Sequence, residues 1–555
     1  MIDITNTFEL WCKKAVADID LITELEAIKN DFDKINDAFF KEMEFGTGGL
    51  RGKIGAGTNR MNVYTVARAT LGLANFILKV NSGKKRVAIG YDTRIKSKLF
   101  AETAAKVLSA KNITVFLFNR PLPTPILSFA VRELCCDAGI MITASHNPAI
   151  YNGYKVYGAD GCQITTKAAD EIYNEISLLD YFNSLPEKAG DNINTVPEEV
   201  YEKFIASVNE LSLAKAVDKS ILVVYTPLNG TGMEPVTDIL KQNGYKNITV
   251  VKEQAAHDGN FPTCPFPNPE LPEAMELGLK YAAENNADIL LATDPDCDRV
   301  GVAVREENKY KLLTGNEVGI LLFDYICGRK TETGTMPTDP ICVKTIVTTE
   351  LAEKIAKTYS VEMVNVLTGF KFIGEKIGLL ESQGQKERYI FGFEESCGYL
   401  SGSHVRDKDG VNAALLICEM CAYYKALGVS LAEKLAELYK EYGYSLNKLL
   451  SYTFEGEVGM EKMRGFMSAM RKITTTFGGF KVLKVTDYSV GVNNLPKSDV
   501  LQFTLTDDCS VIIRPSGTEP KLKFYLFANG ENKQIAQEKT EKLHCLIDNM
   551  IEQTK

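Results

Sequence analysis

Short apolar runs alternate with amphipathic stretches along most of the chain, and this alternation predicts an α/β protein. Each run has the length of a buried strand and ends in a polar or glycine-containing turn, while stretches with helical spacing lie between the runs. Strands alternating with helices favour parallel, doubly wound sheets, whose ligands bind beyond the carboxyl ends of the strands. The predicted strands are Arg86–Gly90, Ile113–Phe118, Gly139–Ile142, Ile221–Tyr225, Ile248–Val251, Ala287–Ala292, Ile341–Val347, Tyr389–Gly392, Asp499–Leu505 and Ser510–Ile513.

The chain begins with a helical pattern. Residues 8–44 contain no Pro, and apolar side chains recur there at helical spacing. We expect this segment to form a helical extension that caps the first domain, and a closing helix over Ile535–Ile551. The apolar positions are Trp11, Val16, Ile19, Ile22, Leu25, Ile28 and Phe32.

The length of 555 residues predicts three or four domains, because one hydrophobic core seldom supports so long a chain. A polar stretch at residues 187–194 indicates the first boundary. The predicted domains are residues 1–190, 191–314, 315–445 and 446–555.

Charge and cysteine content exclude several classes of protein. The net charge is -9 and there is no long basic run, so we expect no nucleic-acid partner. No apolar run reaches the roughly 18 residues of a membrane span, and the first residues do not form a signal peptide, so we expect no membrane partner. Thirteen irregularly spaced cysteines predict reduced thiols in the cytoplasm. The one close pair, Cys418 and Cys421, lies in an apolar helical pattern that favours core packing.

The first candidate for chemistry follows the strand Gly139–Ile142, where the sequence Thr-Ala-Ser-His-Asn-Pro predicts an exposed loop at residues 143–148. Ser145 is flanked there by His146 and Asn147, although an ordinary polar turn has the same composition. Lys155 follows a few residues later, where its side chain is within reach of this loop. A glycine-rich stretch at residues 45–52 contains Arg51, which could bind an anion or lie in a flexible turn.

The second candidate is an acidic loop after the strand Ala287–Ala292. Asp294, Asp296 and Asp298 alternate there, and their carboxylates converge only if the backbone forms a loop. Oxygen ligands favour Mg²⁺ over zinc. A calcium EF-hand is excluded because its sixth and twelfth positions would be Arg299 and Arg305. A solvated acidic turn remains the alternative.

Two further polar loops follow predicted strands. Glu394 and Ser396 offer hydrogen bonds suited to sugar hydroxyls, and the charged run at residues 404–410 contains Lys408. After the strand Ser510–Ile513, the sequence Arg-Pro-Ser-Gly-Thr offers an Arg fork, hydroxyls and a glycine backbone, which suit a phosphate. Each loop taken alone could be a solvated turn.

Together these loops resemble the four signature loops of the α-D-phosphohexomutase superfamily, in its order and spacing. The resembling segments are Thr143–Pro148, Asp294–Arg299, Phe393–Ser396 and Arg514–Thr518, and the resemblance covers nearly the whole chain. Tyr225–Gly230 and Asp258–Pro262 are similar to the phosphoglucomutase-2 branch, which includes phosphopentomutases and a glucose 1,6-bisphosphate synthase. Phe393 departs from the family, where many relatives have Gly.

The resemblance implies three related α/β domains with mixed sheets and a smaller α+β C-terminal domain, arranged around a central cleft. It implies a phosphoglucomutase that interconverts glucose 1-phosphate and glucose 6-phosphate through phosphoserine and glucose 1,6-bisphosphate, which also primes the enzyme. Ser145 would carry the phosphoryl group and complete a Mg²⁺ site with Asp294, Asp296 and Asp298. The implied supporting residues are His146, Lys155, Arg299 and Arg51 for catalysis, with Lys155 as general acid/base of depressed pKa, and Thr368, Gly369, Glu394, Ser396, Lys408, Arg514, Ser516, Gly517 and Thr518 for substrate.

Several alternatives stay open at this point. The preferred substrate could be a pentose phosphate or mannose phosphate, and the chain could instead mainly synthesise the bisphosphate. A catalytically silent scaffold is the remote alternative. The expected partners are small sugar phosphates, and the expected assembly is a monomer or weak homodimer. The family cleft moves its last domain, and Gly443 is the candidate hinge.

Overall fold

The N-terminal segment forms three short helices, so the prediction of one helical run over residues 8–44 is wrong. The helices are α1 (Ile4–Lys14), α2 (Ile19–Ile28) and α3 (Phe32–Phe39). Asp18 and Asp31 interrupt the run because each carboxylate accepts a backbone N–H of the helix that follows it. Trp11 is buried among aromatic rings, whereas three of the apolar positions that recur at helical spacing are exposed: Val16, Ile19 and Phe32.

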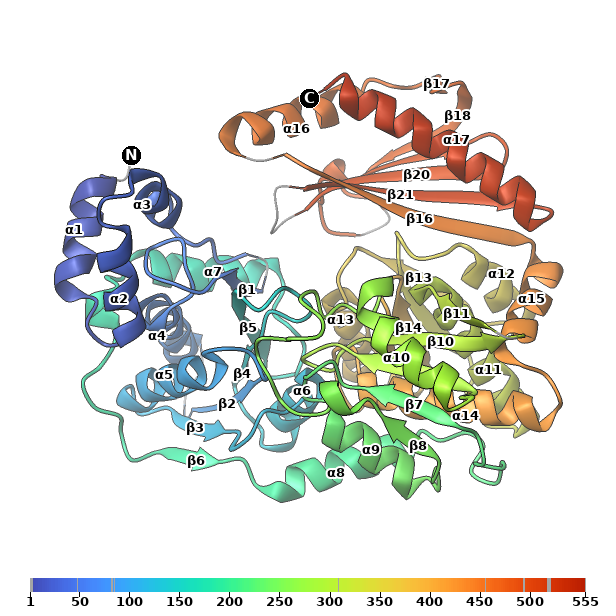
Figure 1. Ribbon diagram of the computed structural model, residues 1–555, viewed down its shortest axis with the longest axis horizontal. Coiled ribbons are helices and arrows are strands. Elements are labelled where there is room, and N and C mark those ends of the chain that lie inside the picture. The colour runs from blue at the N-terminus through green and yellow to red at the C-terminus, as the bar shows by residue number, and fades with distance from the viewer. Residues whose placement is uncertain are drawn as a thin grey trace.

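The computed structural model describes residues 3–46, 48–80, 83, 85–307, 309–454, 456–492, 495–516 and 521–554. Within them, the first sheet has the order β1-β5-β4-β2-β3-β6, and helices cover it (Figure 1). Strands β2, β3, β4 and β6 are parallel, while β1 and β5 add an antiparallel edge. The bounds are β1 Gly49–Lys53, β2 Arg86–Tyr91, β3 Thr114–Leu117, β4 Ala138–Ile142, β5 Tyr151–Gly158, β6 Ile193–Thr195, α4 Val63–Val80, α5 Ser97–Ala110, α6 Thr124–Glu133, α7 Thr166–Ser177 and α8 Glu198–Asn209.

The second and third sheets repeat this plan on a smaller scale. Their orders are β11-β10-β9-β7-β8 and β13-β12-β14-β15, each with a parallel centre and an antiparallel edge. The second comprises β7 Val223–Thr226, β8 Ile248–Val250, β9 Ile289–Thr293, β10 Val300–Glu306 and β11 Lys309–Leu313, with α9 Met233–Gln242 and α10 Pro272–Glu284. The third comprises β12 Ile341–Thr345, β13 Glu362–Val366, β14 Tyr389–Glu394 and β15 Gly398–Leu400, with α11 Gly315–Glu332, α12 Leu351–Thr358, α13 Lys371–Ser382, α14 Gly410–Ala426 and α15 Leu431–Tyr442.

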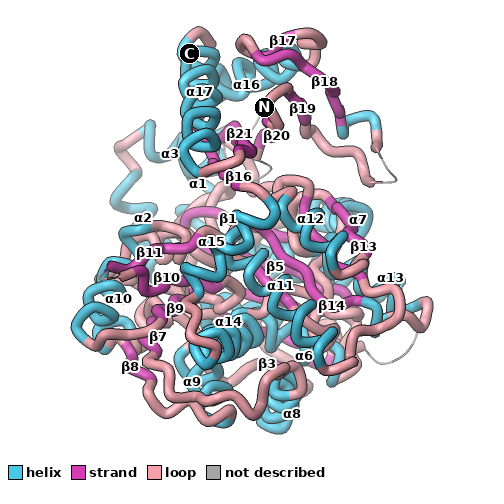
Figure 2. The backbone as a smooth tube through the Cα atoms, turned by 90° about the vertical axis from the view of Figure 1, so that its right-hand side faces the viewer, coloured by secondary structure: helices cyan, strands magenta, loops and turns pink. Residues whose placement is uncertain are grey.

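The last sheet is antiparallel and lies above the other three, with α16 and α17 on its far side (Figures 1 and 2). Its order is β16-β21-β20-β19-β18-β17. The bounds are β16 Tyr444–Thr453, β17 Thr476–Phe477, β18 Phe480–Asp487, β19 Leu501–Leu505, β20 Cys509–Pro515, β21 Lys521–Gly530, α16 Gly456–Met470 and α17 Lys533–Glu552. Single 3₁₀ turns lie at Phe182–Ser184, Lys252–Gln254, Lys386–Arg388 and Tyr488–Val490.

The predicted fold class is confirmed, with mixed rather than purely parallel sheets. The domain limits at residues 190, 314 and 445 stay predictions, and the first sheet takes its sixth strand from Ile193–Thr195. All thirteen cysteines are unpaired, and Cys418 and Cys421 are buried on α14 as predicted. Helix α4 is long and apolar enough to cross a membrane, but 67% of it is buried inside the fold, as in the core helix of a globular domain.

The hydrophobic core is divided unequally. One continuous cluster of buried side chains runs through the first three domains, while the last domain has a core of its own. A separate cluster around Val224 and Leu290 lies within the second domain. A further small cluster joins the third domain to the last, and in it Val347 and Leu367 meet Tyr525 and Phe527. The chain enters the last domain through Gly443, the C-cap of α15, whose φ of 89° favours glycine.

Trp11 anchors the N-terminal helices, because its ring makes edge contacts with Phe39, Tyr64, Tyr181 and Phe182. We expect Trp11→Ala to cost about 3–5 kcal/mol of local stability through the cavity that it leaves. Hydrogen exchange of α1–α3 should accelerate, whereas exchange in α14 should not change. Leu10→Ala is the control, since Leu10 is 40% exposed. Equal acceleration in both variants would contradict this anchoring role.

Candidate active site

Three of the four predicted loops meet where the first three domains converge. The Ser loop (residues 143–148) follows β4, the metal loop (residues 293–299) follows β9, and the sugar loop (residues 394–397) follows β14. Backbone hydrogen bonds join the metal loop to its neighbours. Asp296 O accepts from Thr124 N at 2.9 Å, Cys297 O accepts from Gly410 N at 3.1 Å, and Val300 N donates to Cys397 O at 3.0 Å. The metal loop is therefore fixed to both the first and the third domain.

Ser145 lies at the centre of this junction. Its hydroxyl donates to Asp294 Oδ2 at 2.9 Å and lies 3.2 Å from His146 Nδ1. The predicted exposed loop is wrong for Ser145 itself, which is 3% exposed, because the metal loop covers it. Burial, followed by the positive charges of Arg299 and Arg51, lowers the pKa of His146, so its imidazole is neutral at pH 7.

A buried ion pair supports the Ser loop, and sequence reasoning missed it. Arg94 donates to Ser145 O at 2.5 Å, to Pro148 O at 2.9 Å and also to Asn147 O. Asp92 holds this guanidinium at 3.2 Å and accepts from the Thr143 hydroxyl at 2.6 Å. Both side chains are fully buried. The sequence did contain a signal for this pair, because Asp92 and Arg94 directly follow the buried strand β2, just as the other site loops follow theirs.

Three loops turn through residues with left-handed backbone conformations. The φ angles are 52° at Ser145, 50° at Cys297 and 61° at Cys397. Each such non-glycine residue costs roughly 1–2 kcal/mol. Strain of this size persists where the surrounding structure dictates the backbone, and it commonly does so at functional sites.

The metal loop brings three carboxylates together, as the sequence predicted. One oxygen from each of Asp294, Asp296 and Asp298 lies within 4.8 Å of the others, and all three residues are buried. Two of the oxygens, Asp296 Oδ1 and Asp298 Oδ1, have no hydrogen-bond partner. Buried carboxylate oxygens without donors fit a divalent cation, and an all-oxygen set fits Mg²⁺.

Two lysines from different domains compensate the charge of the triad. Lys155 Nζ of β5 lies 2.9 Å from Asp296 and 3.8 Å from Asp298. Lys408 Nζ lies 3.1 Å from Asp298 and 3.2 Å from Asp407. The sequence predicts Lys155 within reach of the Ser loop, and in the structure its ion pairs are with Asp296 and Asp298 of the triad.

The protonation of the triad follows from its contacts. Burial and repulsion by Asp296 raise the pKa of Asp294 well above its ordinary value. Burial acts in the same direction on Asp296, but the Lys155 ammonium overcomes it and holds that pKa below its ordinary value. The Thr124 hydroxyl, which sequence reasoning also missed, donates to Asp296 Oδ2 at 2.9 Å.

The two predicted arginines, Arg299 of the metal loop and Arg51 of the glycine-rich stretch, both form polar contacts at the junction. Arg299 donates to Glu270 at 2.5 Å and lies 3.8 Å from Asp298. Arg51 on β1 donates to Asn147 Oδ1 at 3.5 Å, which places it at the Ser loop.

The predicted sugar-binding residues lie on one side of the junction. Glu394 accepts from Gly369 N at 2.9 Å, so the two segments named from the sequence are in contact. The hydroxyl of Thr368 is buried without a hydrogen-bond partner, which suits a ligand hydroxyl. Ser396 follows in the turn that closes the sugar loop.

The predicted phosphate-binding segment begins with Arg514 and Pro515, the last two residues of β20. Arg514 influences the pKa of both Tyr525 and Lys371, so it lies near these side chains. Burial lowers the pKa of Lys371 to about 8, a cationic candidate that sequence reasoning missed. Ser516 N donates to Lys521 O at 2.8 Å. Gly517 and Thr518 lie outside the described residues.

Models of one family match three successive segments of the chain. Phosphoglucomutase/phosphomannomutase alpha/beta/alpha domains I, II and III match residues 42–181, 199–308 and 314–442. The chain belongs to the α-D-phosphohexomutase superfamily.

Individual relatives of this superfamily agree over most of the chain. A phosphoglucomutase of Staphylococcus haemolyticus is 37% identical over 90% of this chain and 93% of its own. One of Staphylococcus aureus is 34% identical over 93% of this chain and 95% of its own.

Solved phosphohexomutase structures share the fold. A Thermus thermophilus protein titled as a phosphomannomutase has a TM-score of 0.67 at 23% identity, over 92% of this chain and 99% of its own. The open form of the Paramecium phosphoprotein parafusin, titled as a phosphoglucomutase, has a TM-score of 0.68 at 17% identity, over 93% and 95%.

The geometry of this phosphohexomutase predicts that Asp296→Asn weakens Mg²⁺ binding by about tenfold or more, since one charged oxygen ligand is lost. Calorimetric titration with Mg²⁺, and electron paramagnetic resonance with Mn²⁺, measure binding directly. Asp170→Asn on the exposed surface of α7 is the control and should bind as the unaltered chain does. Unchanged affinity in Asp296→Asn would contradict the metal assignment.

Proposed function

We propose that the chain is a phosphoglucomutase, which interconverts glucose 1-phosphate and glucose 6-phosphate through a phosphoserine and a glucose 1,6-bisphosphate intermediate. The observation that carries this proposal is the contact of the Ser145 hydroxyl with Asp294, 2.9 Å away in a buried carboxylate triad. A nucleophilic hydroxyl against a divalent-metal site suits phosphoryl transfer, in which an enzyme mainly positions and neutralises charge. The relatives named as phosphoglucomutases, at 34–37% identity, support the same reaction.

Ser145 is the proposed carrier of the phosphoryl group. Mg²⁺ held by Asp294, Asp296, Asp298 and the seryl phosphate would neutralise charge on the transferring group. In the first half-reaction the bond between Ser145 Oγ and phosphorus breaks, and a bond forms from phosphorus to a hydroxyl of the sugar monophosphate. The second half-reaction reverses these bonds at the other end of the sugar. The neutral imidazole of His146 lies 3.2 Å from the Ser145 oxygen and can accept or donate a hydrogen bond there.

Lys155 is the proposed proton carrier. Its side chain is 13% exposed, and its ammonium lies against the triad, on the strand next to the one that leads into Ser145. It would give a proton to the departing Ser145 oxygen and take one from the attacking sugar hydroxyl, so that protons balance over each transfer. Arg299 and Arg51 would supply positive charge beside the same oxygen.

Each end of the sugar phosphate must face Ser145 in turn, so the sugar has to bind in two orientations. Thr368, Gly369, Glu394 and Ser396 are the proposed partners of the sugar hydroxyls, since they lie on adjoining turns of the third domain. Lys408 lies between Asp298 and Asp407, where it can reach the substrate from the same side. The phosphate that does not react would bind in the last domain. Its proposed ligands are Arg514, Ser516, Gly517 and Thr518.

Phosphorus NMR tests the reaction. With Mg²⁺, glucose 1-phosphate and a trace of glucose 1,6-bisphosphate, we expect glucose 6-phosphate to accumulate, and to accumulate more slowly without the bisphosphate. Ribose 1-phosphate in a parallel sample measures the pentose activity. Faster conversion of ribose 1-phosphate would overturn the glucose assignment, and no conversion of either would overturn the mutase.

The role of Ser145 gives a separate prediction. Ser145→Ala should lower turnover by a factor of about a million, because transfer through a covalent intermediate is lost. Labelling from ³²P-glucose 1,6-bisphosphate followed by mass spectrometry should find phosphate on Ser145 in the unaltered chain and none in the variant. The control, Ser177→Ala on the exposed end of α7, should be labelled normally. A labelled, active Ser145→Ala protein would refute the assignment.

A further inference from the structure

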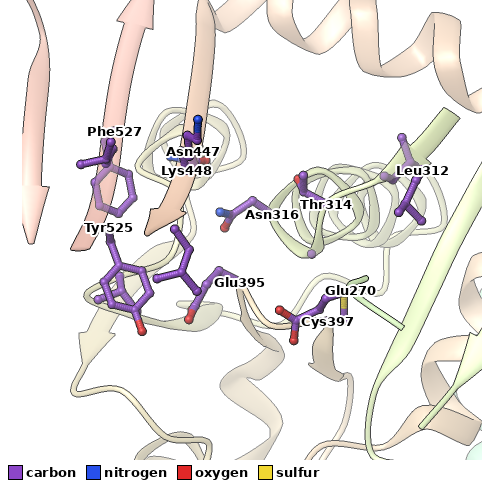
Figure 3. A pocket seen from close by; sticks show the side chains of 15 residues that line it. Glu270, Leu312, Thr314, Asn316, Glu395, Cys397, Asn447, Lys448, Tyr525 and Phe527 are labelled. Atoms are coloured by element: carbon purple, nitrogen blue, oxygen red, sulfur yellow. The ribbon is translucent and has the colours of Figure 1, made fainter. Parts of the chain in front are cut away.

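A cavity of about 220 Å³ lies beside the sugar loop, two of whose residues, Glu395 and Cys397, line it (Figure 3). Its walls come from three domains: Glu270 and β11 of the second, the first turn of α11 and the sugar loop of the third, and β16 with β21 of the last. None of the residues proposed above for catalysis, metal or substrate lines it. The cavity is therefore separate from the proposed active site but shares the sugar loop with it.

Glu395 is the distinctive group in this cavity. Its carboxylate accepts from the Thr348 hydroxyl at 3.2 Å and, more weakly, from Thr345 at 3.4 Å. Among the described residues, no Lys, Arg or His lies within ion-pair distance of it. Burial and repulsion by Glu394 raise the pKa of Glu395 to about 7. A half-buried carboxylate without a cation is costly, and a positive group bound beside it would relieve that cost.

The remaining lining favours the same kind of ligand. Glu270 adds a second carboxylate, which Arg299 partly neutralises. The lining residue Lys448 keeps its positive charge on the other face of the last sheet, because its ammonium lies 2.9 Å from His544 Nδ1 on α17. The last domain contributes mainly apolar groups, and the rings of Tyr525 and Phe527 lie on the side of the cavity opposite Glu270 (Figure 3).

We propose that this cavity binds a small organic cation, an amine on an apolar body, with the ammonium group paired to Glu395 and the body against Tyr525 and Phe527. The size agrees, because a cavity of roughly 150 Å³ accommodates benzene. An ammonium group beside a carboxylate and aromatic rings combines a charge-assisted hydrogen bond with cation–π attraction. The assignment rests on the cavity and its charges, and does not require the mutase reaction.

An occupant would be coupled to the sugar loop and to the last domain. Glu395 follows Glu394, the proposed sugar ligand, and Glu270 holds Arg299 of the metal loop at 2.5 Å. Tyr525 and Phe527 also belong to the small cluster through which the last domain rests on the third. A ligand that contacts these groups would change the protein's affinity for sugar phosphate. By reciprocity, sugar phosphate would change the protein's affinity for this ligand by the same factor.

Benzylamine is the test ligand, and benzyl alcohol is its neutral counterpart. Calorimetric titration of the full chain, with Mg²⁺ present to occupy the triad, should show benzylamine binding about tenfold or more tightly than benzyl alcohol, because a hydrogen bond to a charged group is the stronger. Glu395→Gln should remove this preference while preserving shape. Saturating glucose 1-phosphate should change the benzylamine affinity about fivefold.

Two controls separate this site from others. Glu387→Gln, at a side chain that is 82% exposed, should bind benzylamine as the unaltered chain does. Asp296→Asn should also retain binding, which distinguishes the cavity from the triad. Three results would each overturn the proposal: no benzylamine binding at about 10 mM, a level at which even a millimolar complex is mostly formed, equal binding of benzyl alcohol, or undiminished binding to Glu395→Gln. An affinity unchanged by glucose 1-phosphate would overturn the coupling.

Discussion

The burial of three carboxylates on one loop is the constraint on which the site depends. Charges so close cannot lie away from water unless cations compensate them, and removing one partner of a buried pair typically costs about 3–5 kcal/mol. The compensating groups come from elsewhere in the chain: Lys155 belongs to the first domain and Lys408 to the third. The metal loop itself belongs to the second. The charge balance is therefore complete only when three domains are assembled, which ties the formation of the site to the packing of the domains.

The division of the hydrophobic core agrees with this requirement. The three domains that balance the triad share one continuous core, so the Ser loop, the metal loop and the sugar loop have a common rigid support. The last domain has a separate core and touches the third through a small cluster around Val347 and Tyr525. Separate cores joined by a small interface favour movement of one domain against the rest. Arg514, the proposed phosphate ligand at the end of β20, can thus move relative to the triad without disturbing the buried charges.

The positions of the Ser, metal and sugar loops could be predicted because each directly follows a buried strand, and that pattern is local. The sequence predicted the carboxylate cluster and the α/β class for the same reason. It failed where the cause lies far along the chain. The support of the Ser loop by Asp92 and Arg94 spans 51 residues, and Thr124 reaches Asp296 across 172. The breaks in the N-terminal helical segment had a local signal, because Asp18 and Asp31 are residues that commonly cap helices. The prediction of one helical run followed the apolar spacing instead.

The shapes of the loops also arise from contacts between domains rather than from local preference. A side chain at Gly410 would place its Cβ 2.5 Å from Cys297 O, and one at Gly315 would lie 2.1 Å from Glu395 O. Helices of the third domain are therefore pressed against the metal loop and the sugar loop. Cys297 and Cys397 adopt the left-handed conformation within these tightly packed loops, despite its cost. Because the strain is held by packing that exists without substrate, the loops are aligned before a ligand arrives, and binding energy need not be spent on shaping them.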